Sequence, residues 1–411
     1  MHVTTTDIFT RTQWPTPDQL WQTARLSGFP AAIWRLPNAD EKHLILQTES
    51  ALAEAPVDFD ELSSGFVLSR FDNFDHGNSA PFKALFLRAD LHFSATAGGT
   101  DWQPANEASA SWWSATGSLL SVDKAPASDL SAFTTNDNPA EKARFEEIVA
   151  EAVSHMKKGG FRKVVASRTK TITFGQKPDV LRLFDRLCQA YPTAFISAVW
   201  LPEYQQIWIS ATPERLVSVD RDGFFRTLSL AGTQSAFHPD GTEKLPAEAL
   251  WSQKEIEEQA LVSRYIIECF KKIRLREYLE EGPRTIQAGN LMHLGSHFTV
   301  NTRAVHYPQL GTVMLRLLHP TSAVCGMPRA AAFQFIQQHE GYDREFYSGF
   351  LGPVNIQEES HLFVHIRCLK LENRQATLYA GAGLTEDSVP EREWQETEMK
   401  CQTLLRCLTV S

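Results

Sequence analysis

The stretch AFISAVWLPEYQQIWISATPERLVSVDRDGFFRTLSLAGT, residues 194–233, contains a series of segments rich in Ile, Val, Leu, Phe and Trp that are separated by short turns. Short apolar runs bounded by Pro, Asp and Gly are typical of β-strands. Strands that follow one another through short turns pair in antiparallel fashion, because parallel neighbours need a long crossover. The stretch therefore predicts a largely antiparallel sheet rather than alternating strand–helix winding.

The segments on either side extend this pattern and add helices. FRKVVASRTKTITF at 161–174 predicts a strand, and HLFVHIRCLKL at 361–371 with ATLYAGAG at 376–383 predicts a hairpin. Apolar residues at helical spacing predict helices at 139–158, 178–191, about 247–279, 328–340 and from about 390 onward. The expected fold class is α+β, with large, mostly antiparallel sheets flanked by helices in a single large domain.

The first third of the chain gives weaker signals. AAIWRL, HLILQT, FVLSRF and ALFLRADLHFSAT read as strands. Residues 99–138 are dominated by Gly, Ser, Thr, Ala, Asp and Asn, apart from the pair Trp112–Trp113. This composition predicts a long surface excursion or a weak boundary.

Composition and charge exclude several classes of protein. Of 411 residues, 43% are hydrophobic and 22% are charged, as in an ordinary globular chain. No apolar run approaches the roughly 18 residues of a membrane span, and the first residues lack the features of a secretory signal. The net charge of −9 argues against a nucleic-acid partner. Six scattered cysteines without a CxxC pair are expected to be reduced, in a cytoplasmic protein.

Two predicted helices each carry a pair of carboxylates on one face. Glu255 and Glu258 are three residues apart in KEIEEQALV, and Glu393, Glu396 and Lys400 share a face in PEREWQETEMK. Taken singly, such pairs are more often solvated acidic faces. If the two faces converge, their mutual repulsion calls for a cation, and all-oxygen ligands favour Mg²⁺ over zinc.

Two further residues are candidates for acid–base work. Lys163 begins a strand directly after a glycine stop, and Glu214 follows Pro213 in ATPERLV. Each residue also has a more ordinary interpretation: Lys163 as an exposed lysine, and Glu214 as a glutamate in a turn. Burial would instead lower the pKa of the lysine and raise that of the glutamate, giving a base and an acid.

A zinc site is a weaker alternative. MHLGSHF places His293 and His297 four residues apart. That spacing suits a helix, whereas the segment reads as a strand or loop, and no third ligand is evident.

Several motifs together resemble the chorismate-utilising enzymes. They occur in that family's order over about 139–408: KVVASR, ATPERL, LAGT, KEIEEQALV, MHLGS, LHPTSAVCGMPRAA, YSGFLGP, IRCLKL, LYAGAG and EWQETEMK. The family includes isochorismate synthases, salicylate synthases and the synthase subunits for anthranilate and aminodeoxychorismate. The resemblance implies that 1–138 form a variable N-terminal part of the same fold and that 139–411 form the chorismate-binding catalytic region.

The resemblance also implies roles for individual residues. Lys163 would activate the water that attacks C2 of chorismate, and Glu214 would protonate the departing C4 hydroxyl. Glu258 and Glu396 would hold Mg²⁺, with Glu255 and Glu393 close behind. The implied substrate-binding residues are Leu230, Gly232, Thr233, His293, Ala323, Tyr347, Gly352, Arg367, Gly381 and Lys400.

Within the family, the residues favour water addition and hence an isochorismate synthase. The aminating branches usually lack a lysine where Lys163 stands, and aminodeoxychorismate synthases carry a lysine where Ala231 stands here. A salicylate synthase is the main alternative, although that branch tends to have Thr at the position of Ala323. A catalytically silent chorismate-binding protein should have lost one of the key residues. We expect a monomer that needs no glutaminase subunit, and the downstream pathway, menaquinone or siderophore, stays open.

Overall fold

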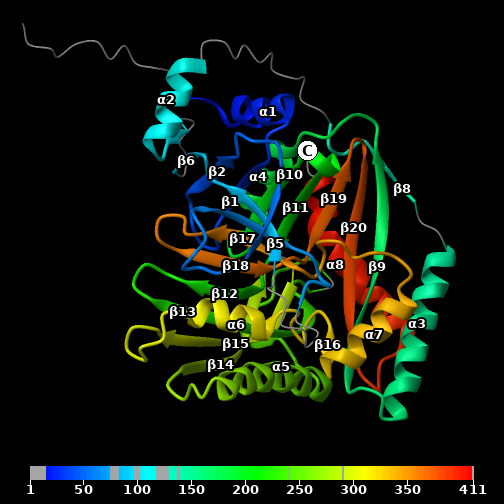
Figure 1. Cartoon of the computed structure of the whole chain (residues 1–411). Coiled ribbons are helices and arrows are strands. Elements are labelled where there is room, and N and C mark those ends of the chain that lie inside the picture. Colours follow the sequence, from blue (N-terminus) through cyan, green and yellow to red (C-terminus); the bar gives the residue numbers. More distant parts are fainter. Residues whose placement is uncertain are drawn as a thin grey trace, which may run out of the picture.

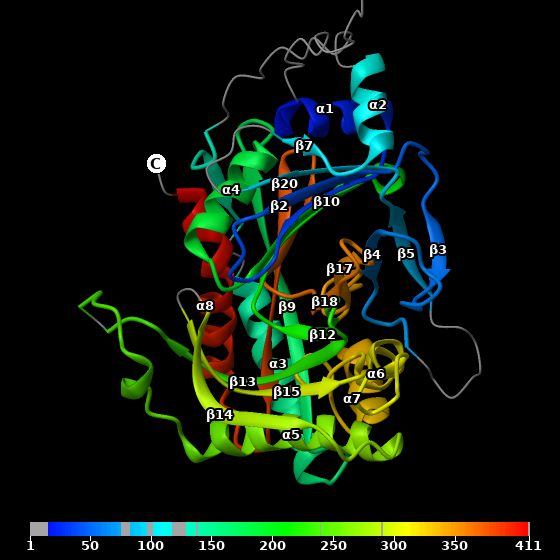
Figure 2. The same cartoon turned by 90° about the vertical axis from the view of Figure 1, so that its left-hand side faces the viewer.

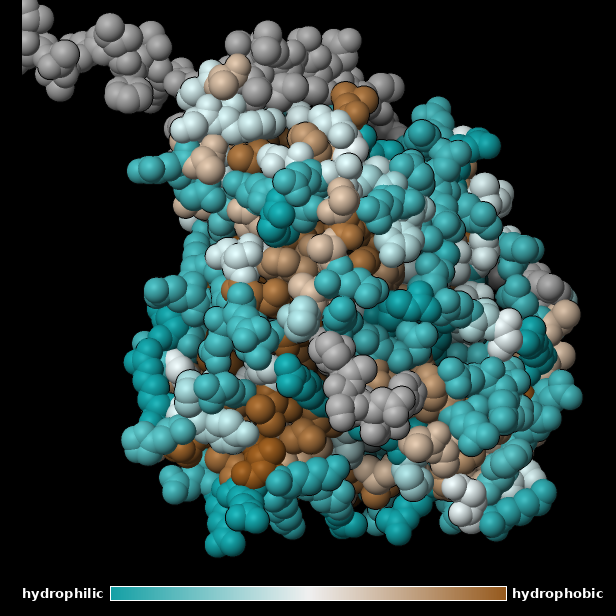
Figure 3. All heavy atoms as spheres, in the orientation of Figure 1, coloured by the Kyte–Doolittle hydropathy of each residue, from teal (hydrophilic) through white to brown (hydrophobic). Residues whose placement is uncertain are grey.

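Two antiparallel sheets with helices on their outer faces make up the computed structural model, which describes residues 15–74, 83–96, 102–116, 129–136, 139–238, 240–288 and 291–409 (Figure 1). The α+β class expected from the sequence is therefore confirmed. Hydrophilic residues cover most of the face seen in Figure 3, with apolar residues showing between them. No helix in the described part of the chain has the length and apolar character needed to span a bilayer.

The larger sheet, sheet A, has 11 strands. Its order is β16 (Gly326–Met327), β9 (Lys163–Phe174), β20 (Gln375–Leu384), β19 (Cys368–Glu372), β11 (Gln206–Thr212), β10 (Phe195–Leu201), β1 (Ala31–Arg35), β2 (Lys42–Leu46), β6 (Leu91–Ala95) and β7 (Gln103–Pro104), with β8 (Phe133–Thr135) also paired to β9. The four strands that follow β9 in this order, β20, β19, β11 and β10, are those of the predicted hairpin and of the first half of 194–233.

The smaller sheet, sheet B, has nine strands. Its order is β14 (Leu279–Ala288), β15 (Leu291–Asn301), β13 (Phe224–Ser235), β12 (Arg215–Val219), β18 (Ser360–Val364), β17 (Phe350–Val354), β4 (Gly65–Ser69), β5 (Lys83–Arg88) and β3 (Ala53–Pro56). Segments from before residue 139 thus complete both sheets: β1 pairs with β10, and β4 pairs with β17.

Eight helices are present among the described residues: α1 (Pro17–Ser27), α2 (Glu107–Thr116), α3 (Pro139–Lys157), α4 (Val180–Ala190), α5 (Gln253–Lys272), α6 (Leu310–Leu318), α7 (Arg329–His339) and α8 (Pro390–Thr409). Helices α4 and α8 pack against sheet A, and α5 and α6 against sheet B. Figures 1 and 2 both show α5 running beneath β14 and β15. The predicted excursion at 99–138 contains β7, α2 and β8, and its residues 99–101, 117–128 and 137–138 lie outside the described residues.

The long helix predicted at about 247–279 is shorter in the structure. Helix α5 begins at Gln253 because Ser252 is its N-cap and forms a capping box with Glu255. It ends near Arg274, whose φ of 60° lies in the left-handed region. The apolar residues beyond this point belong instead to the approach to β14, so helical spacing overestimated the helix at both ends.

Two segments that read as single strands are each divided between the sheets. HLFVHIRCLKL forms β18 in sheet B and β19 in sheet A, and ALFLRADLHFSAT forms β5 in sheet B and β6 in sheet A. The chain leaves the first sheet at Arg367, whose φ is 49°. Both halves of each segment are apolar because both sheets bury their strands, so the sequence pattern does not reveal the crossing.

The space between the sheets is filled by large aromatic residues. Phe195 on β10 stacks on Phe363 of β18 with ring centroids 4.2 Å apart, and Trp208 on β11 stacks on Tyr379 of β20. Phe195 and Phe363 are at most 1% exposed. This layer fixes the separation of the sheets and therefore the place where the crossing segments meet.

We predict that Phe363→Ala will destabilise the fold by about 3–5 kcal/mol, because it removes half of a fully buried stack that joins the two sheets. The measurement is the free energy of unfolding in urea. Leu26→Ala is the control, since Leu26 is 83% exposed and its truncation should change stability by less than about 0.5 kcal/mol. Equal stabilities of the two variants would contradict the role of this stack.

Candidate active site

A cavity of about 340 Å³ lies where the ends of β13, β15 and β20 meet the N-terminal halves of α5 and α8. Most of the residues singled out in the sequence line it. They are Glu214, Leu230, Gly232, Thr233, Glu255, Glu258, His293, Ala323, Arg367, Gly381, Glu393, Glu396 and Lys400. The two carboxylate-bearing helix faces therefore converge on one space, which is the condition under which their repulsion calls for a cation.

Glu214 and Arg367 reach the cavity from two neighbouring crossings between the sheets. Glu214 lies between β11 of sheet A and β12 of sheet B, and Arg367 lies between β18 and β19. The crossings are hydrogen-bonded to each other: Val364 N–H donates to the Glu214 carbonyl over 2.9 Å, and Ala211 N–H donates to the Arg367 carbonyl over 3.0 Å. This pairing fixes an acid and a guanidinium at one end of the cavity.

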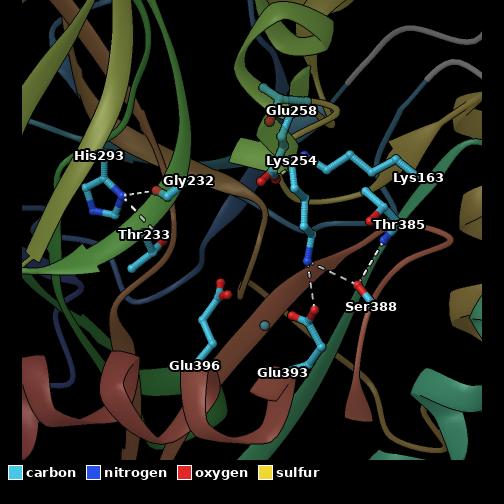
Figure 4. A network of polar contacts seen from close by, with 12 residues as sticks. Lys163, Gly232, Thr233, Lys254, Glu258, His293, Thr385, Ser388, Glu393 and Glu396 are labelled. Carbon is cyan, nitrogen blue, oxygen red and sulfur yellow. Dashed lines mark hydrogen bonds and ion pairs between the residues drawn. The ribbon is translucent and has the colours of Figure 1, made fainter. Parts of the chain in front are cut away.

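Three lysines neutralise three of the cavity glutamates, and Figure 4 shows two of these lysines, Lys163 and Lys254. Lys163 Nζ lies 2.7 Å from Glu258 Oε1. Lys254 Nζ lies 2.9 Å from Glu393 Oε1, and Lys400 Nζ lies 2.6 Å from Glu396 Oε1. Buried carboxylates need such partners, because an unpaired charge in a low-dielectric interior is costly.

Lys163 is buried, with 1% of its surface exposed, so the ordinary alternative of an exposed lysine is wrong. Its pair with Glu258 depends on Gly383, where a Cβ would lie 2.6 Å from Glu258 Oε1 and 3.3 Å from Lys163 Cε. Burial acts to raise the pKa of Glu258, but the charge and hydrogen bond of Lys163 bring it below the ordinary value. Lys163 does not line the cavity itself and lies directly behind Glu258.

The remaining glutamates differ in their surroundings. Glu255 Oε2 accepts hydrogen bonds of 2.8 Å from the backbone N–H and the hydroxyl of Ser252, so this carboxylate caps its own helix. Burial, and then the negative charge of Glu396, raises the pKa of Glu393. The Glu393–Glu396 repulsion is thus only partly balanced by the lysines.

The donor set fits a hard divalent cation better than zinc. The glutamates of α5 and α8 offer four carboxylates to the cavity, whose lining contains no cysteine, and carboxylate oxygens are preferred by Mg²⁺. With the side chains paired to lysines as they are, no three His, Cys, Asp or Glu residues in the described ranges lie close enough to hold a metal. A cation at this place must therefore compete with the ammonium groups for the same oxygens.

Glu214 has the properties of a buried acid. It is 5% exposed, and its one side-chain hydrogen bond from the protein is a long one, 3.5 Å from the Thr321 hydroxyl. Burial raises its pKa to about 7, against the opposing influence of Lys163 and Arg367. Near neutral pH the carboxyl can therefore hold a proton and give it up.

The hydrogen bonds of His293 define its tautomer. Nδ1 lies 2.7 Å from the Gly232 carbonyl oxygen, which can only accept, so Nδ1 carries the proton. Burial, followed by the charges of Arg367 and Lys400, lowers the pKa of His293 to about 3, so the ring is neutral. Nε2 is buried and has no hydrogen-bond partner among the residues that the structure describes, so it is left as an acceptor for a ligand hydroxyl.

Arg367 is a buried cation with little compensation from the protein. It is 7% exposed, and its hydrogen bond to a protein side chain is a long one, 3.4 Å to the Thr403 hydroxyl. Burial lowers its pKa from the ordinary value. Such a guanidinium is suited to bind an anionic group of a ligand.

Two predicted substrate-binding residues lie outside the cavity lining. Tyr347 is buried behind Gly381, where a Cβ would lie 2.8 Å from the tyrosine hydroxyl. Gly352 lies within β17 at a φ of 150°, and a Cβ there would collide with the carbonyl oxygen of His361. The structure gives Gly352 a reason to be glycine that lies in the packing of sheet B, not in the cavity.

The zinc alternative is wrong on geometry. His293 and His297 both belong to β15, where residues four apart are separated by about 13 Å along the strand. A single metal ion cannot bridge that distance.

The lining residues that the sequence did not single out include Lys254, Gly383 and Arg392. A signal existed for two of them. Lys254 precedes Glu255 directly, and Gly383 is two residues from Gly381 and so lies on the same face of its strand. Nothing in the sequence marks Arg392, which reaches the cavity from the first turn of α8.

The fold and the cavity define a two-sheet α+β protein with a charged site for a small anionic ligand. The chain belongs to the chorismate binding enzyme family, whose model matches residues 92–409. The isochorismate synthase EntC of Escherichia coli (strain K12) is 32% identical over 269 residues, covering 64% of this chain and 67% of the relative. The isochorismate synthase MenF of the same organism is 26% identical over 417 residues, covering 94% and 90%.

A solved structure shares the fold. The putative 2,3-dihydroxybenzoate-specific isochorismate synthase DhbC from Bacillus anthracis superimposes with a TM-score of 0.71 at 21% identity, covering 93% of this chain and 97% of that one. The likeness extends over the N-terminal strands as well as the cavity region.

We predict a pH-dependent effect of Glu214→Gln on stability. The folded state binds the Glu214 proton more tightly than the unfolded state, so ionising this carboxyl costs stability as pH rises from about 4.5 to about 7. The glutamine variant avoids that cost and should exceed the wild type by up to about 3 kcal/mol at pH 8. Most of the advantage should disappear at pH 5, as measured by urea unfolding. The same difference at both pH values would contradict the raised pKa.

Proposed function

We propose that this protein is an isochorismate synthase that adds water to C2 of chorismate and releases the C4 hydroxyl. Family membership supplies the substrate class, and the relatives EntC and MenF bear this activity in their names. The observation that carries the proposal is the buried Glu214, whose pKa of about 7 lets it act as an acid inside a cavity that also contains the cations Arg367 and Lys400.

The cavity cations would anchor the dianionic substrate. Arg367 has donors to spare for one carboxylate, and Lys400, which donates 2.7 Å to the Gly381 carbonyl, lies on the same side of the site. His293 Nε2 would accept a hydrogen bond from a substrate hydroxyl, because its other nitrogen is committed to Gly232. Leu230 and Ala323 supply apolar contacts for the ring. These contacts would fix the ring between acid and base.

The proton transfers balance within the proposed reaction. Lys163 would act as the base and take a proton from water as the C2–O bond forms. The ring double bonds shift as the C4–O bond breaks, and Glu214 would give its proton to the departing hydroxyl, which leaves as water. The product is therefore an isomer of the substrate.

Mg²⁺ belongs to the same proposal. Glu258 and Glu396 would hold it directly, with Glu393 nearby and Glu255 retained as the cap of α5. When bound, the ion would neutralise the glutamates and ligate a substrate carboxylate. The need for it follows from charge: without further cations, a dianion would approach four carboxylates.

A salicylate synthase is the competing function, because it forms the same intermediate and then expels pyruvate. Ala323 lines the cavity at the position where that branch tends to carry threonine, so a hydroxyl that could assist elimination is missing there. We further propose that the enzyme works in the cytoplasm as a monomer without a glutaminase subunit, and that its product enters either menaquinone or siderophore synthesis.

The function is tested by incubating the purified protein with chorismate and Mg²⁺, resolving the products by chromatography and assaying pyruvate separately. We expect isochorismate without stoichiometric pyruvate. Salicylate together with pyruvate would move the assignment to the salicylate synthases, and unchanged chorismate would remove the proposed activity.

We predict that Lys163→Met will reduce the rate of isochorismate formation by about 10²–10⁴-fold, because it removes the proposed base. Chorismate binding, measured by calorimetry, should change only a few-fold, since Lys163 lies behind the cavity lining. Lys370→Met is the matched control: Lys370 pairs with Glu345 at 2.5 Å in sheet A, away from the site, and its loss should leave the rate unaltered. A Lys163 variant with near wild-type turnover would rule out this base.

A further inference from the structure

Lys254 occupies the middle of the carboxylate group, where a metal ion would be expected. Figure 4 shows it reaching from α5 towards the first turn of α8, with Glu258 and Lys163 on one side and Glu393 and Glu396 on the other. Its ammonium lies 2.9 Å from Glu393 Oε1 and 3.3 Å from Ser388 Oγ. Its positive charge also interacts favourably with the carboxylates of Glu258 and Glu396.

The position is unfavourable for a lysine on local grounds. Lys254 is the second residue of α5, and the N-terminal end of a helix carries a partial positive charge that repels cations. The cavity glutamates compensate for this repulsion. Lys254 is therefore held in place by the carboxylates. In turn it compensates the charge of Glu393, which is only 3% exposed and would otherwise be a buried, unpaired carboxylate.

A divalent cation and this ammonium cannot both occupy the group without strong repulsion. Like charges a few ångströms apart repel strongly in a partly buried site, and Lys254 is bound to Glu393, which lies beside the proposed metal ligands Glu258 and Glu396. The Ser388 hydroxyl accepts a hydrogen bond of 3.1 Å from the backbone N–H of Thr385. This hydroxyl carries no charge, so it cannot replace Glu393 as the partner of the ammonium when a metal ion binds that carboxylate.

We propose that Lys254 is a built-in counter-cation of the metal site, which holds the carboxylates of α5 and α8 together before the metal binds and lowers the affinity for Mg²⁺ because the ion must displace it. The inference rests on the metal site of the proposed function and adds to it a positioning residue. Lys254 thereby sets how much Mg²⁺ the enzyme needs, independently of the acid–base steps assigned to Lys163 and Glu214.

The test measures Mg²⁺ binding by calorimetry in the absence of chorismate. Lys254→Met should bind Mg²⁺ at least about tenfold more tightly than the wild type, because it removes the competing charge and frees Glu393. Lys254→Arg keeps the charge and should stay within about twofold of the wild type. Lys370→Met should leave the affinity unchanged, since its ion pair lies elsewhere.

Thermal unfolding supplies a second readout. Without metal, Lys254→Met should melt at a lower temperature than the wild type, and saturating Mg²⁺ should close that gap, since ligand binding stabilises the folded state. A purely structural role would leave the gap in place. Should the methionine variant not fold, Lys254→Gln, which keeps a hydrogen bond to Glu393 without the charge, serves the same test.

Equal or weaker Mg²⁺ binding by the uncharged variants would overturn the role of Lys254 while leaving the proposed metal site intact. Absence of Mg²⁺ binding in every variant and in the wild type would remove the metal from the proposed function and this inference with it. Formation of isochorismate from chorismate, assayed separately, distinguishes the two failures from loss of the enzyme activity itself.

Discussion

The structure around the cavity depends on the pairing of buried carboxylates with lysines at the convergence of α5 and α8. Glu258 meets Lys163, Glu393 meets Lys254 and Glu396 meets Lys400, each within 2.9 Å. Negative charges gathered in a low-dielectric space would otherwise drive the two helices apart. The same pairs keep the site receptive to a cation, because an ion pair between flexible side chains can be exchanged for a metal–carboxylate contact without unfolding a helix.

The two sheets form the side of the cavity that lies opposite α5 and α8. The aromatic layer between the sheets sets their separation, and two neighbouring crossings of the chain deliver Glu214 and Arg367 to one end of the cavity. Because the crossings are hydrogen-bonded to each other, the acid and the guanidinium cannot move independently. A substrate carboxylate bound by Arg367 would therefore be held in a fixed relation to the proton on Glu214, which is the geometric condition for general acid catalysis.

The electrostatics of the cavity are compatible with the proposed dianionic substrate only if a further cation binds with it. Arg367 and Lys400 line the same cavity as the glutamates of the two helices, and Lys400 is paired directly with Glu396. His293 is neutral and presents a bare acceptor, so it recognises a hydroxyl and not a charge. Polar, acidic and basic groups are thus brought together in one cavity of about 340 Å³, in which a ligand would meet both signs of charge and a neutral acceptor.

The sequence by itself determined the local elements and the residue types of the site. Strand-forming runs, the capping signal at Ser252, and the carboxylates three apart on α5 and α8 all follow from interactions within a few residues. Only the tertiary structure decided which partner each group has. Folding buried Lys163 against Glu258 and divided HLFVHIRCLKL between the two sheets at Arg367. It also placed His293 and His297 far apart on one strand and gave Gly352 a role in packing. The physical reason is that periodicity reports which face of an element is apolar, whereas charge pairing and burial depend on segments that are brought together by folding from distant parts of the chain.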